Sequence, residues 1–421
     1  MVQEQSYPTV DDLHFSKKKV IFAYRLTKII SKMKRLTLLF ALLLASSATM
    51  AYTPNKIVIP NVDGYVTLKG DFHMHTIFSD ATVWPTTRVE EAAWEGLDVI
   101  AITDHIDTRH QKMRKRGYFT EKCDRDASYK LAKAVAAKND VIVIHGGEIT
   151  RGMPPGHFNC LFVKDNDDIC AAAEKNDHDH VLAMEGGLRE ARKQGALLMW
   201  NHPNWSKHAP NETIMWPAHK KILKEGLMDA IEIFNAETGY SPESHEWCLK
   251  HNLAIMGCSD SHSPFFTKLD YKGGQHRVVT LLFAKERSAE GVREAIESRR
   301  TAVFGEGVVY GREQELLPLF HACVKVKNVK FSPKQLTFVL ENTSSIPIRL
   351  TKAPGSEKYW FDRHIYLAPH STHSLKVRLV LVDNKQPLMS EDTKNILVNF
   401  FVESFQIGAN KPLPVTFNVE W

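Results

Sequence analysis

The chain has 421 residues, of which 43% are hydrophobic and 24% are charged, a composition typical of globular proteins and a length that allows two domains. Its formal net charge of +5 arises in the first 51 residues, which hold eight basic and three acidic side chains. The rest of the chain holds 46 basic and 46 acidic residues. This balance lacks the strong basic excess of a nucleic-acid-binding protein, although it leaves a local basic patch open.

The N-terminus has the pattern of a targeting segment. From Met33 the sequence MKRLTLLFALLLASSATMA places two basic residues before an apolar stretch and then small residues, the order found in secretory signals. The apolar stretch is too short to span a bilayer comfortably, so we expect cleavage after Ala51 or Ala48 and no stable membrane anchor afterwards. We therefore interpret residues 33–51 as a signal peptide, residues 1–32 as a disordered stretch or an upstream artefact of start-codon choice, and the mature chain as exported, either periplasmic or secreted.

The six cysteines are scattered without the paired spacing of a metal site: Cys123, Cys160, Cys170, Cys248, Cys258 and Cys323. In an oxidising compartment some of them can form disulfides, and the sequence leaves the pairing open.

Residues 52–318 are predicted to form one α/β domain, because short apolar runs alternate with helical patterns, as in repeated βα units. Several of the runs are apolar throughout, which is typical of parallel strands that are covered on both faces. Strands are expected at 64–75, 97–105, 140–148, 157–163, 195–203, 229–236 and 253–262, with a further candidate at 277–284.

Two of the helical patterns carry start signals. The pattern at 86–97 is predicted to open with a capping box formed by Thr87 and Glu90. The pattern at 241–252 is predicted to have Ser241 as its N-cap and Pro242 at the first helical position.

Residues 319–421 have a different sequence pattern from the preceding part. Their apolar segments are β-rich, helical patterns disappear, and Asn, Pro, Ser and Gly separate the segments. This predicts a small all-β sandwich as an accessory domain, and it offers no candidate catalytic cluster.

Metal-capable side chains cluster at the ends of the predicted strands. His73 and His75 share one face of a strand because side chains alternate with period 2, and Asp260 and His262 form a second same-face pair. In a parallel α/β barrel the carboxyl ends of the strands form a single face, so residues far apart in sequence meet there. The strand-end set is His73, His75, Asp80, Asp104, His105, Glu148, His157, His202, Asp260 and His262. Isolated histidines such as His145 and His219 are interpreted as structural.

The order of these motifs resembles the PHP family, named for polymerase and histidinol phosphatase domains. The motifs are DFHMHTIFSD, AITDH, the Glu of GGE, GHFNCLFV, NHP and GCSDSH, and the resemblance covers about residues 65 to 310. It implies a distorted (β/α)7 TIM-like barrel with up to three divalent metals at its C-terminal face. The resemblance does not extend to the β-rich tail.

Carried over to this chain, the resemblance implies three ligand sets. One metal takes His73, His75, Glu148 and Asp260; a second takes Asp80, His105 and His262; a third takes Glu148, His157 and His202, with Glu148 bridging. Mixed imidazole and carboxylate ligands suit Zn, Mn or Fe.

Such a di- or trinuclear centre predicts hydrolysis of phosphate esters by a metal-activated hydroxide, with no protein nucleophile. Glu148 and Asp260 are the expected catalytic ligands, and Asp104 is interpreted as an orienting or proton-carrying residue or as a strand-end cap. A cation for the substrate phosphate is also expected, and Arg277, Lys207 and Arg109 are the candidates, although each also fits an ordinary surface charge.

The expected substrate is a small phosphorylated metabolite or a nucleotide. One alternative is a metal-dependent amidohydrolase, which also begins with a same-face histidine pair on a barrel strand. Another is an exported binding module whose barrel is degenerate. The sequence leaves open the natural substrate, the preference for mono- or diesters, the metal and the oligomeric state.

Overall fold

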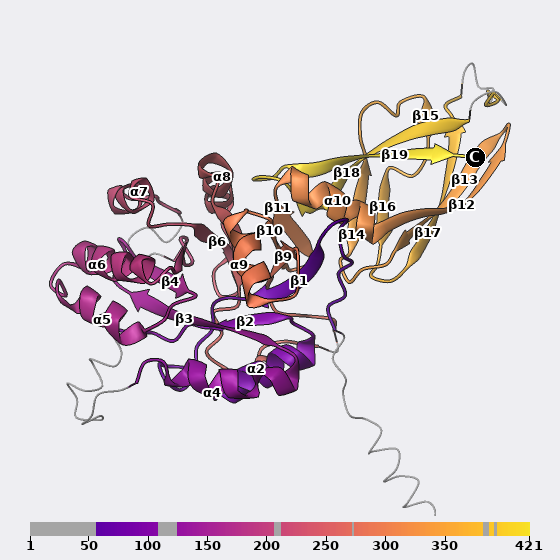
Figure 1. Cartoon of the computed structure of the whole chain (residues 1–421). Coiled ribbons are helices and arrows are strands. Elements are labelled where there is room, and N and C mark those ends of the chain that lie inside the picture. The colour runs from indigo at the N-terminus through magenta and orange to yellow at the C-terminus, as the bar shows by residue number, and fades with distance from the viewer. Residues whose placement is uncertain (1–55, 108–123, 206–211, 272, 382–386, 391–393) are drawn as a thin grey trace, which may run out of the picture. The chain divides into compact units, whose positions relative to one another are not determined.

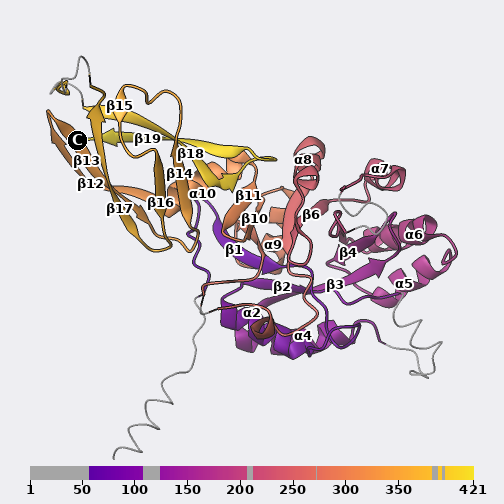
Figure 2. The ribbon, with the colours of Figure 1, turned by 180° about the vertical axis from the view of Figure 1, so that it is seen from behind.

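The structure is a computed structural model that describes residues 56–107, 124–205, 212–271, 273–381, 387–390 and 394–421, all within one compact unit (Figures 1 and 2). The predicted signal peptide, residues 1–32, Cys123, Arg109 and Lys207 lie outside the described residues. Within the described ranges, no helix combines the length and the apolar character needed to cross a membrane.

The first part is a mixed α/β domain built on a twisted, barrel-like sheet. Its strands are β1 (Val66–Asp71), β2 (Val99–Ile102), β3 (Ile142–Thr150), β4 (His157–Leu161), β5 (Leu197–Trp200), β6 (Ala230–Asn235), β7 (Gly239–Tyr240), β8 (Ala254–Cys258), β9 (Val279–Ala284), β10 (Thr301–Gly305) and β11 (Val308–Gly311). The strands β1, β2 and β3 pair in parallel, as do β5, β6 and β8. Most are buried along their whole length, as their continuous apolar sequences predicted.

The strand β4 runs against its neighbours, which the sequence pattern did not indicate. It pairs antiparallel with both β3 and β5. The register places Thr150 opposite His157 and Glu148 opposite Asn159. The first residue of β4 therefore lies at the same sheet edge as the carboxyl ends of the parallel strands, and this is why His157 joins residues that end their strands.

The barrel closes between β1 and the segment after β8. Met74 and Ser261 form an isolated parallel bridge. His75 donates its backbone N–H to the Ser261 carbonyl at 3.1 Å, and Asp260 donates to the His73 carbonyl at 2.8 Å. This closure brings the two same-face pairs of the sequence side by side.

Eight α-helices are described: α2 (Pro85–Glu95), α4 (Ala127–Ala136), α5 (Asn166–Glu174), α6 (His180–Lys193), α7 (Pro217–Lys224), α8 (Pro242–His251), α9 (Ala289–Glu297) and α10 (Glu313–Cys323). Two 3₁₀ turns, Ala137–Asn139 and Phe265–Thr267, complete the helical elements. Both views show α2 and α4 on the same side of the strands β1 to β3 (Figures 1 and 2).

The two helix-start predictions had opposite outcomes. The capping box of Thr87 and Glu90 is wrong, because α2 begins at Pro85 and its N-cap is Trp84, without a side-chain capping bond. Proline at the first helical position starts the helix earlier and places Thr87 inside the first turn. The start of α8 is confirmed, since the Ser241 side chain accepts a hydrogen bond from the Ser244 backbone N–H and Pro242 is the first helical residue.

The second part is a small antiparallel β-sandwich, as predicted. Its strands are β12 (Val324–Ser332), β13 (Gln335–Asn342), β14 (Ile348–Lys352), β15 (Tyr359–Trp360), β16 (His364–Leu367), β17 (Thr372–Leu379), β18 (Asn395–Gln406) and β19 (Pro412–Glu420). One sheet has the order β12–β13–β17–β15, and the other contains β16, β14, β18 and β19. Buried and partly exposed residues alternate along β13, as expected of a strand with one face on a core.

The two parts share backbone pairing and apolar contacts. The strand β18 of the sandwich pairs in parallel with β11, with Val309 opposite Phe405. The helix α10 leads directly into β12, and its Phe320 ring lies 5.8 Å from the rings of both Phe405 and Phe417.

The cysteines play no part in cross-linking among the described residues. Cys160, Cys170, Cys248, Cys258 and Cys323 are buried, free thiols. Burial raises the pKa of the Cys170, Cys248 and Cys323 thiols to about 12, so they stay protonated at neutral pH.

Candidate metal centre

The structure brings all nine predicted ligand residues to the carboxyl-terminal edge of the barrel. Eight of them form three groups whose potential ligand atoms lie within 4.8 Å of one another. The groups are His75, Asp80, His105 and His262; His73, Glu148 and His202; and His73, His75 and Asp260. The ninth, His157, places its Nδ1 atom 2.9 Å from Glu148 Oε1.

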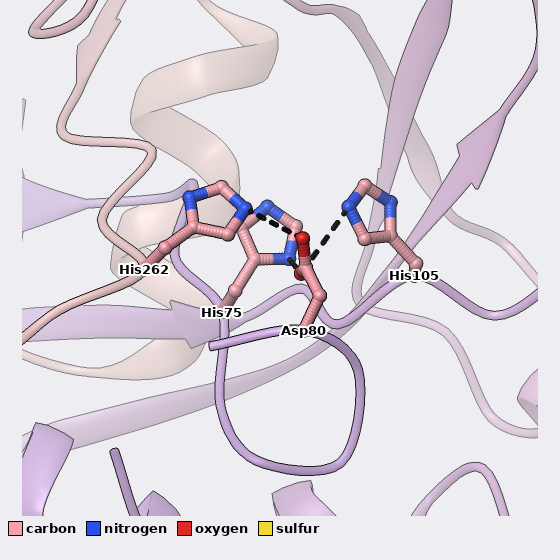
Figure 3. A group of neighbouring side chains, drawn as sticks. All are labelled: His75, Asp80, His105 and His262. Carbon is pink, nitrogen blue, oxygen red and sulfur yellow. Dashed lines mark ion pairs between the residues drawn. The ribbon is translucent and has the colours of Figure 1, made fainter. Parts of the chain in front are cut away.

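The first group surrounds the carboxylate of Asp80, which comes from the loop after β1 (Figure 3). His262 Nε2 lies 3.3 Å from Asp80 Oδ2, and His105 Nε2 lies 3.5 Å from Oδ1. Figure 3 shows His262 and His105 on opposite sides of Asp80, with His75 between them. Four side chains from three separate strand ends therefore point toward one small region.

The other two groups share His73 and meet between two buried carboxylates. His73 Nε2 lies 3.2 Å from Asp260 Oδ1 and 3.7 Å from Glu148 Oε1. His75 Nε2 faces the same two carboxylates, at 3.1 Å from Asp260 Oδ1 and 3.5 Å from Glu148 Oε2. Glu148 is the central carboxylate, because His105 Nδ1 also lies 2.7 Å from its Oε2 atom.

The distance groups overlap with the three ligand sets that the resemblance implied. His73, His75 and Asp260 lie together as implied, and His157 contacts Glu148 as implied. In addition, His75 lies within the group around Asp80, and His73 lies within the group of Glu148 and His202. The closure of the barrel and the direction of β4 set these distances, and neither feature can be read from the spacing of the motifs.

The donor atoms have the properties of metal ligands. His73 Nε2, His75 Nε2, His105 Nε2 and His202 Nδ1 are buried and make no well-aligned hydrogen bond within the part of the chain that the structure describes. A buried polar atom without a partner is costly, and several that converge from different strands are satisfied together by divalent cations. The residues present therefore fit divalent metals.

The protonation states support the same interpretation. Burial, and then the charge of His105, lower the pKa of His75 to about 3. Burial and the neighbouring His157 lower the pKa of His202 to about 3. Burial alone would raise the pKa of Glu148, but His105 and His157 outweigh it and bring the pKa well below its usual value. His75 and His202 are thus neutral and Glu148 is ionised, the forms in which these groups bind metals. Burial would lower the pKa of His105, but the charge of Glu148 outweighs it and raises that pKa.

Another carboxylate, that of Glu232 on β6, positions two of the histidines. The sequence analysis did not identify Glu232 as part of the site. Both its oxygens lie 3.3 Å from His73 Nδ1, and Oε2 accepts the His202 backbone N–H at 2.8 Å. Burial by itself would lower the pKa of His73, but Asp260 and Glu232 raise it well above its usual value. A charged residue inside the otherwise apolar run AIEIFN was the available signal.

Two asparagines hold the ligand carboxylates. Asn201 Nδ2 donates to Glu148 Oε1 at 3.1 Å, and Asn235 Nδ2 donates to Asp260 Oδ2 at 3.2 Å. Both side chains are fully buried. Asn201 follows the apolar strand β5, and Asn235 ends the apolar strand β6. A search of strand ends that included amides as well as histidines and carboxylates would therefore have found both.

Asp104 serves the loop that carries Asp80. Its carboxylate accepts the Thr76 backbone N–H and the Thr76 hydroxyl, each at 2.7 Å, and the Ser79 hydroxyl at 2.6 Å. These bonds match the orienting role considered for Asp104, because they fix the turn between His75 and Asp80.

Arg277 does not have the position expected of a phosphate contact, and that prediction is corrected. Its side chain is fully buried and bound by Glu95 at 2.5 Å and by Asp71 at 3.3 Å. The paired carboxylates occupy the guanidinium, so it joins α2 to β1. His145 and His219 are structural as interpreted, with Nε2 of His145 2.9 Å from Asp126 and Nε2 of His219 2.6 Å from the Pro155 carbonyl.

The comparisons with known proteins decide the family. A two-domain protein from Bacteroides vulgatus, which contains a predicted PHP-like metal-dependent phosphoesterase, is 37% identical; the match covers 88% of this chain and 100% of that chain, with a TM-score of 0.77. The chain belongs to the PHP family. The model of an Ig-like domain family, DUF5001, matches residues 324–418 of this PHP protein.

More distant matches add no argument about function. A putative metal-dependent phosphoesterase from Bifidobacterium adolescentis is 17% identical, with a TM-score of 0.34, and the match covers 46% of this chain and 87% of that one. An amidohydrolase from Chromobacterium violaceum is 15% identical, with a TM-score of 0.32 and coverages of 46% and 88%. No curated protein matches the chain.

Proposed function

We propose that this PHP protein is an exported hydrolase of phosphate esters. Its substrate is a small phosphorylated metabolite or a nucleotide, and its cofactors are two or three divalent metals, namely Zn, Mn or Fe. The observation that carries the proposal is the convergence of buried imidazole nitrogens, which make no well-aligned hydrogen bond among the described residues, on the carboxylates of Glu148, Asp260 and Asp80.

Bound divalent metals would activate a water molecule for attack and neutralise charge on the phosphoryl group. The chain's own residues prepare that chemistry. Glu232 holds His73 through its Nδ1 atom and leaves Nε2 directed at Glu148 and Asp260. Asn201 and Asn235 orient those two carboxylates. The cluster is therefore set in place before substrate arrives, which is where the catalytic advantage of such a site lies.

A small substrate is supported by how little of the cluster is exposed. The His262 side chain is 27% exposed and that of Asp80 13%, whereas His73 and Glu148 have no exposed surface. A phosphate group thus meets the cluster at its partly exposed edge, which includes His262, Asp80 and His157. The balanced charge of the chain after residue 51 gives no support for a long polyanion.

The test is metal analysis of the mature protein combined with a panel of phosphate esters. We expect the Glu148→Gln variant to bind less metal and to lose hydrolysis, because its amide would place a donor against His105 or His157. The control is Glu243→Gln, at an exposed position on α8. Full metal content and activity in Glu148→Gln would refute the assignment, and cleavage of amides or lactones instead of phosphates would favour the amidohydrolase alternative.

Export is tested separately by N-terminal sequencing of the protein recovered outside the cytoplasm. We expect a new N-terminus after Ala51 or Ala48. Peptides from residues 1–32 in the mature protein would contradict it.

A further inference from the structure

One tryptophan stands beside the candidate metal centre without belonging to a core. The ring of Trp205 lies 5.0 Å from the ring of His157 and 5.4 Å from that of His202. Its side chain is nevertheless 41% exposed. Among the described residues it belongs to none of the apolar core clusters. Part of the indole therefore contacts two predicted ligands and part faces solvent.

The position of Trp205 is fixed by the chain around it. Its backbone N–H donates to the His202 carbonyl at 2.9 Å. The preceding residue, Asn204, forms two hydrogen bonds with Thr238: its Nδ2 donates to the Thr238 carbonyl at 2.9 Å, and its Oδ1 accepts from the Thr238 hydroxyl at 2.8 Å. These bonds tie the segment after β5 to the turn between β6 and β7. These bonds fix the backbone that carries the indole, and the indole itself stays partly exposed.

The neighbouring ligand side chains are those nearest to solvent on this side of the cluster. His157 is 12% exposed, whereas its partner carboxylate Glu148 has no exposed surface. A substrate held by its phosphate at the cluster would carry its leaving group outward past His157. A partly exposed indole at that point offers a flat apolar surface to the leaving group.

We propose that Trp205 stacks against an aromatic ring in the leaving group, so that the site prefers phosphate esters of ring-bearing alcohols, such as aryl phosphates or nucleotides. This inference rests on the proposed function and names the substrate class of the same site. Aromatic rings stack on tryptophan whatever their hydrogen-bonding pattern, because every such ring has a π-face. Selection by Trp205 would therefore act on the presence of a ring and not on its identity.

The experiment compares two non-hydrolysable ligands, phenylphosphonate and methylphosphonate, binding to the Mn²⁺-loaded mature chain. Calorimetric titration gives both dissociation constants. We expect the wild-type protein to bind phenylphosphonate about tenfold more tightly than methylphosphonate. Trp205→Ala should abolish that preference, and Trp205→Phe should retain part of it. The matched control is Trp360→Ala, since Trp360 is 57% exposed on β15 of the sandwich, and it should keep the full preference.

The outcomes separate this inference from the proposed function. If Trp205→Ala weakens both phosphonates equally or releases metal, Trp205 only shields its histidines and the inference is overturned. It is also overturned if the wild-type protein shows no preference for the ring, or if Trp205→Ala keeps the preference. If the ring preference depends on Trp205 but no phosphate ester is hydrolysed, the inference stands as a binding property and the proposed hydrolysis fails.

Discussion

At the scale of single residues, the candidate centre depends on buried side chains that hold the predicted ligands in position. Glu232 is buried among apolar side chains of β6, where a carboxylate is costly unless hydrogen bonds or charged partners compensate for its burial. Its carboxylate has three partners, namely His73 Nδ1, the His202 backbone N–H and Asn235 Nδ2. Through these bonds it fixes both the tautomer and the direction of a predicted ligand, as carboxylates behind metal-bound histidines do.

We expect Glu232→Gln to lower metal affinity by about 10- to 100-fold, the usual effect of losing such a partner. The amide retains the volume of the side chain but removes the negative charge that favours a well-oriented His73. Equilibrium dialysis against Mn²⁺ or Zn²⁺ measures the change, with Glu243→Gln as the exposed control. Unchanged affinity would show that His73 is held by Asp260 alone.

His219 makes a separate prediction about pH. Its Nδ1 accepts the Trp216 backbone N–H at 3.1 Å, its Nε2 lies 2.6 Å from the Pro155 carbonyl, and its ring stacks on Trp200. The buried imidazole is thus neutral, with both nitrogens occupied. Burial lowers the pKa of His219 from 6.5 to about 4.

Between those two pH values His219 is protonated in the unfolded chain and neutral in the folded chain. The stability from His219 is therefore complete above pH 6.5 and is lost as the pH falls toward 4, by on the order of 3 kcal/mol. Denaturant titrations of the chelated protein at pH 7.5 and 4.5 should show a smaller loss in His219→Gln than in the wild-type chain. His251→Gln, at an exposed position on α8, should follow the wild type. Parallel losses in all three proteins would contradict the assignment.

At the scale of elements, α2 locks the two ends that close the barrel. Arg88 is fully buried, and its guanidinium donates to the carbonyls of His75 at 3.0 Å, Ser261 at 2.8 Å and Ser263 at 3.1 Å. These carbonyls belong to the two segments that carry the same-face ligand pairs. One side chain of a helix thus holds ligands from both ends of the barrel sequence together.

Arg88→Met should reduce the free energy of unfolding by about 3 kcal/mol or more, because it removes three hydrogen bonds from a charged donor, each of which contributes about 1.5–3 kcal/mol. It should also weaken metal binding, since the β1 and β8 ends would no longer be clamped. Guanidinium denaturation and metal titration measure the two effects. The matched control is Arg189→Met on α6, where a 51% exposed arginine pairs with Glu225, and it should change stability by less than about 0.5 kcal/mol. Equal effects of the two substitutions would rule out a clamp.

The elements also show why the sequence indicated the family and the candidate ligand residues, but not which of those residues lie together in space. Same-face pairs such as His73 with His75 follow apolar runs, and that local pattern is enough to place them at strand ends. Which ligands share a group depends on the direction of β4 and on the closure at Ser261, and both are set by long-range pairing. The error at Thr87 is of the opposite kind, because a neighbouring proline changed a local signal.

Arg277 marks another limit of the sequence. Its position near a predicted strand end suggested a free cation, but its ion-pair partners come from β1 and α2, far away in the chain. No spacing rule reveals such a pairing. The sequence analysis missed Glu232 because two of its partners, His73 and His202, are far from it in the sequence and come close only in the folded chain.

At the scale of the whole molecule, metal should act as a stabilising ligand. The ligand atoms come from β3, β4 and the segments that follow β1, β2, β5 and β8, so cations held there would bind the folded chain far better than the unfolded one.

Removal of metal with a chelator should therefore lower the melting temperature by on the order of 5–10 °C, and added Mn²⁺ or Zn²⁺ should restore it. Differential scanning calorimetry measures the shift. The same treatment of Glu148→Gln should give a clearly smaller change, because that variant lacks the central carboxylate. An identical melting temperature with and without chelator in the wild-type protein would argue against a metal centre.

The pairing of β18 with β11, and the packing of Phe320 on Phe405 and Phe417, have an evolutionary consequence. A frameshift or stop codon shortly after Cys323 would remove the sandwich and leave α10 with a bare aromatic face and β11 with an open edge. Such a truncated product would aggregate and not persist as a smaller protein. Selection on the part that carries the candidate metal centre would therefore also preserve the reading frame of the sandwich.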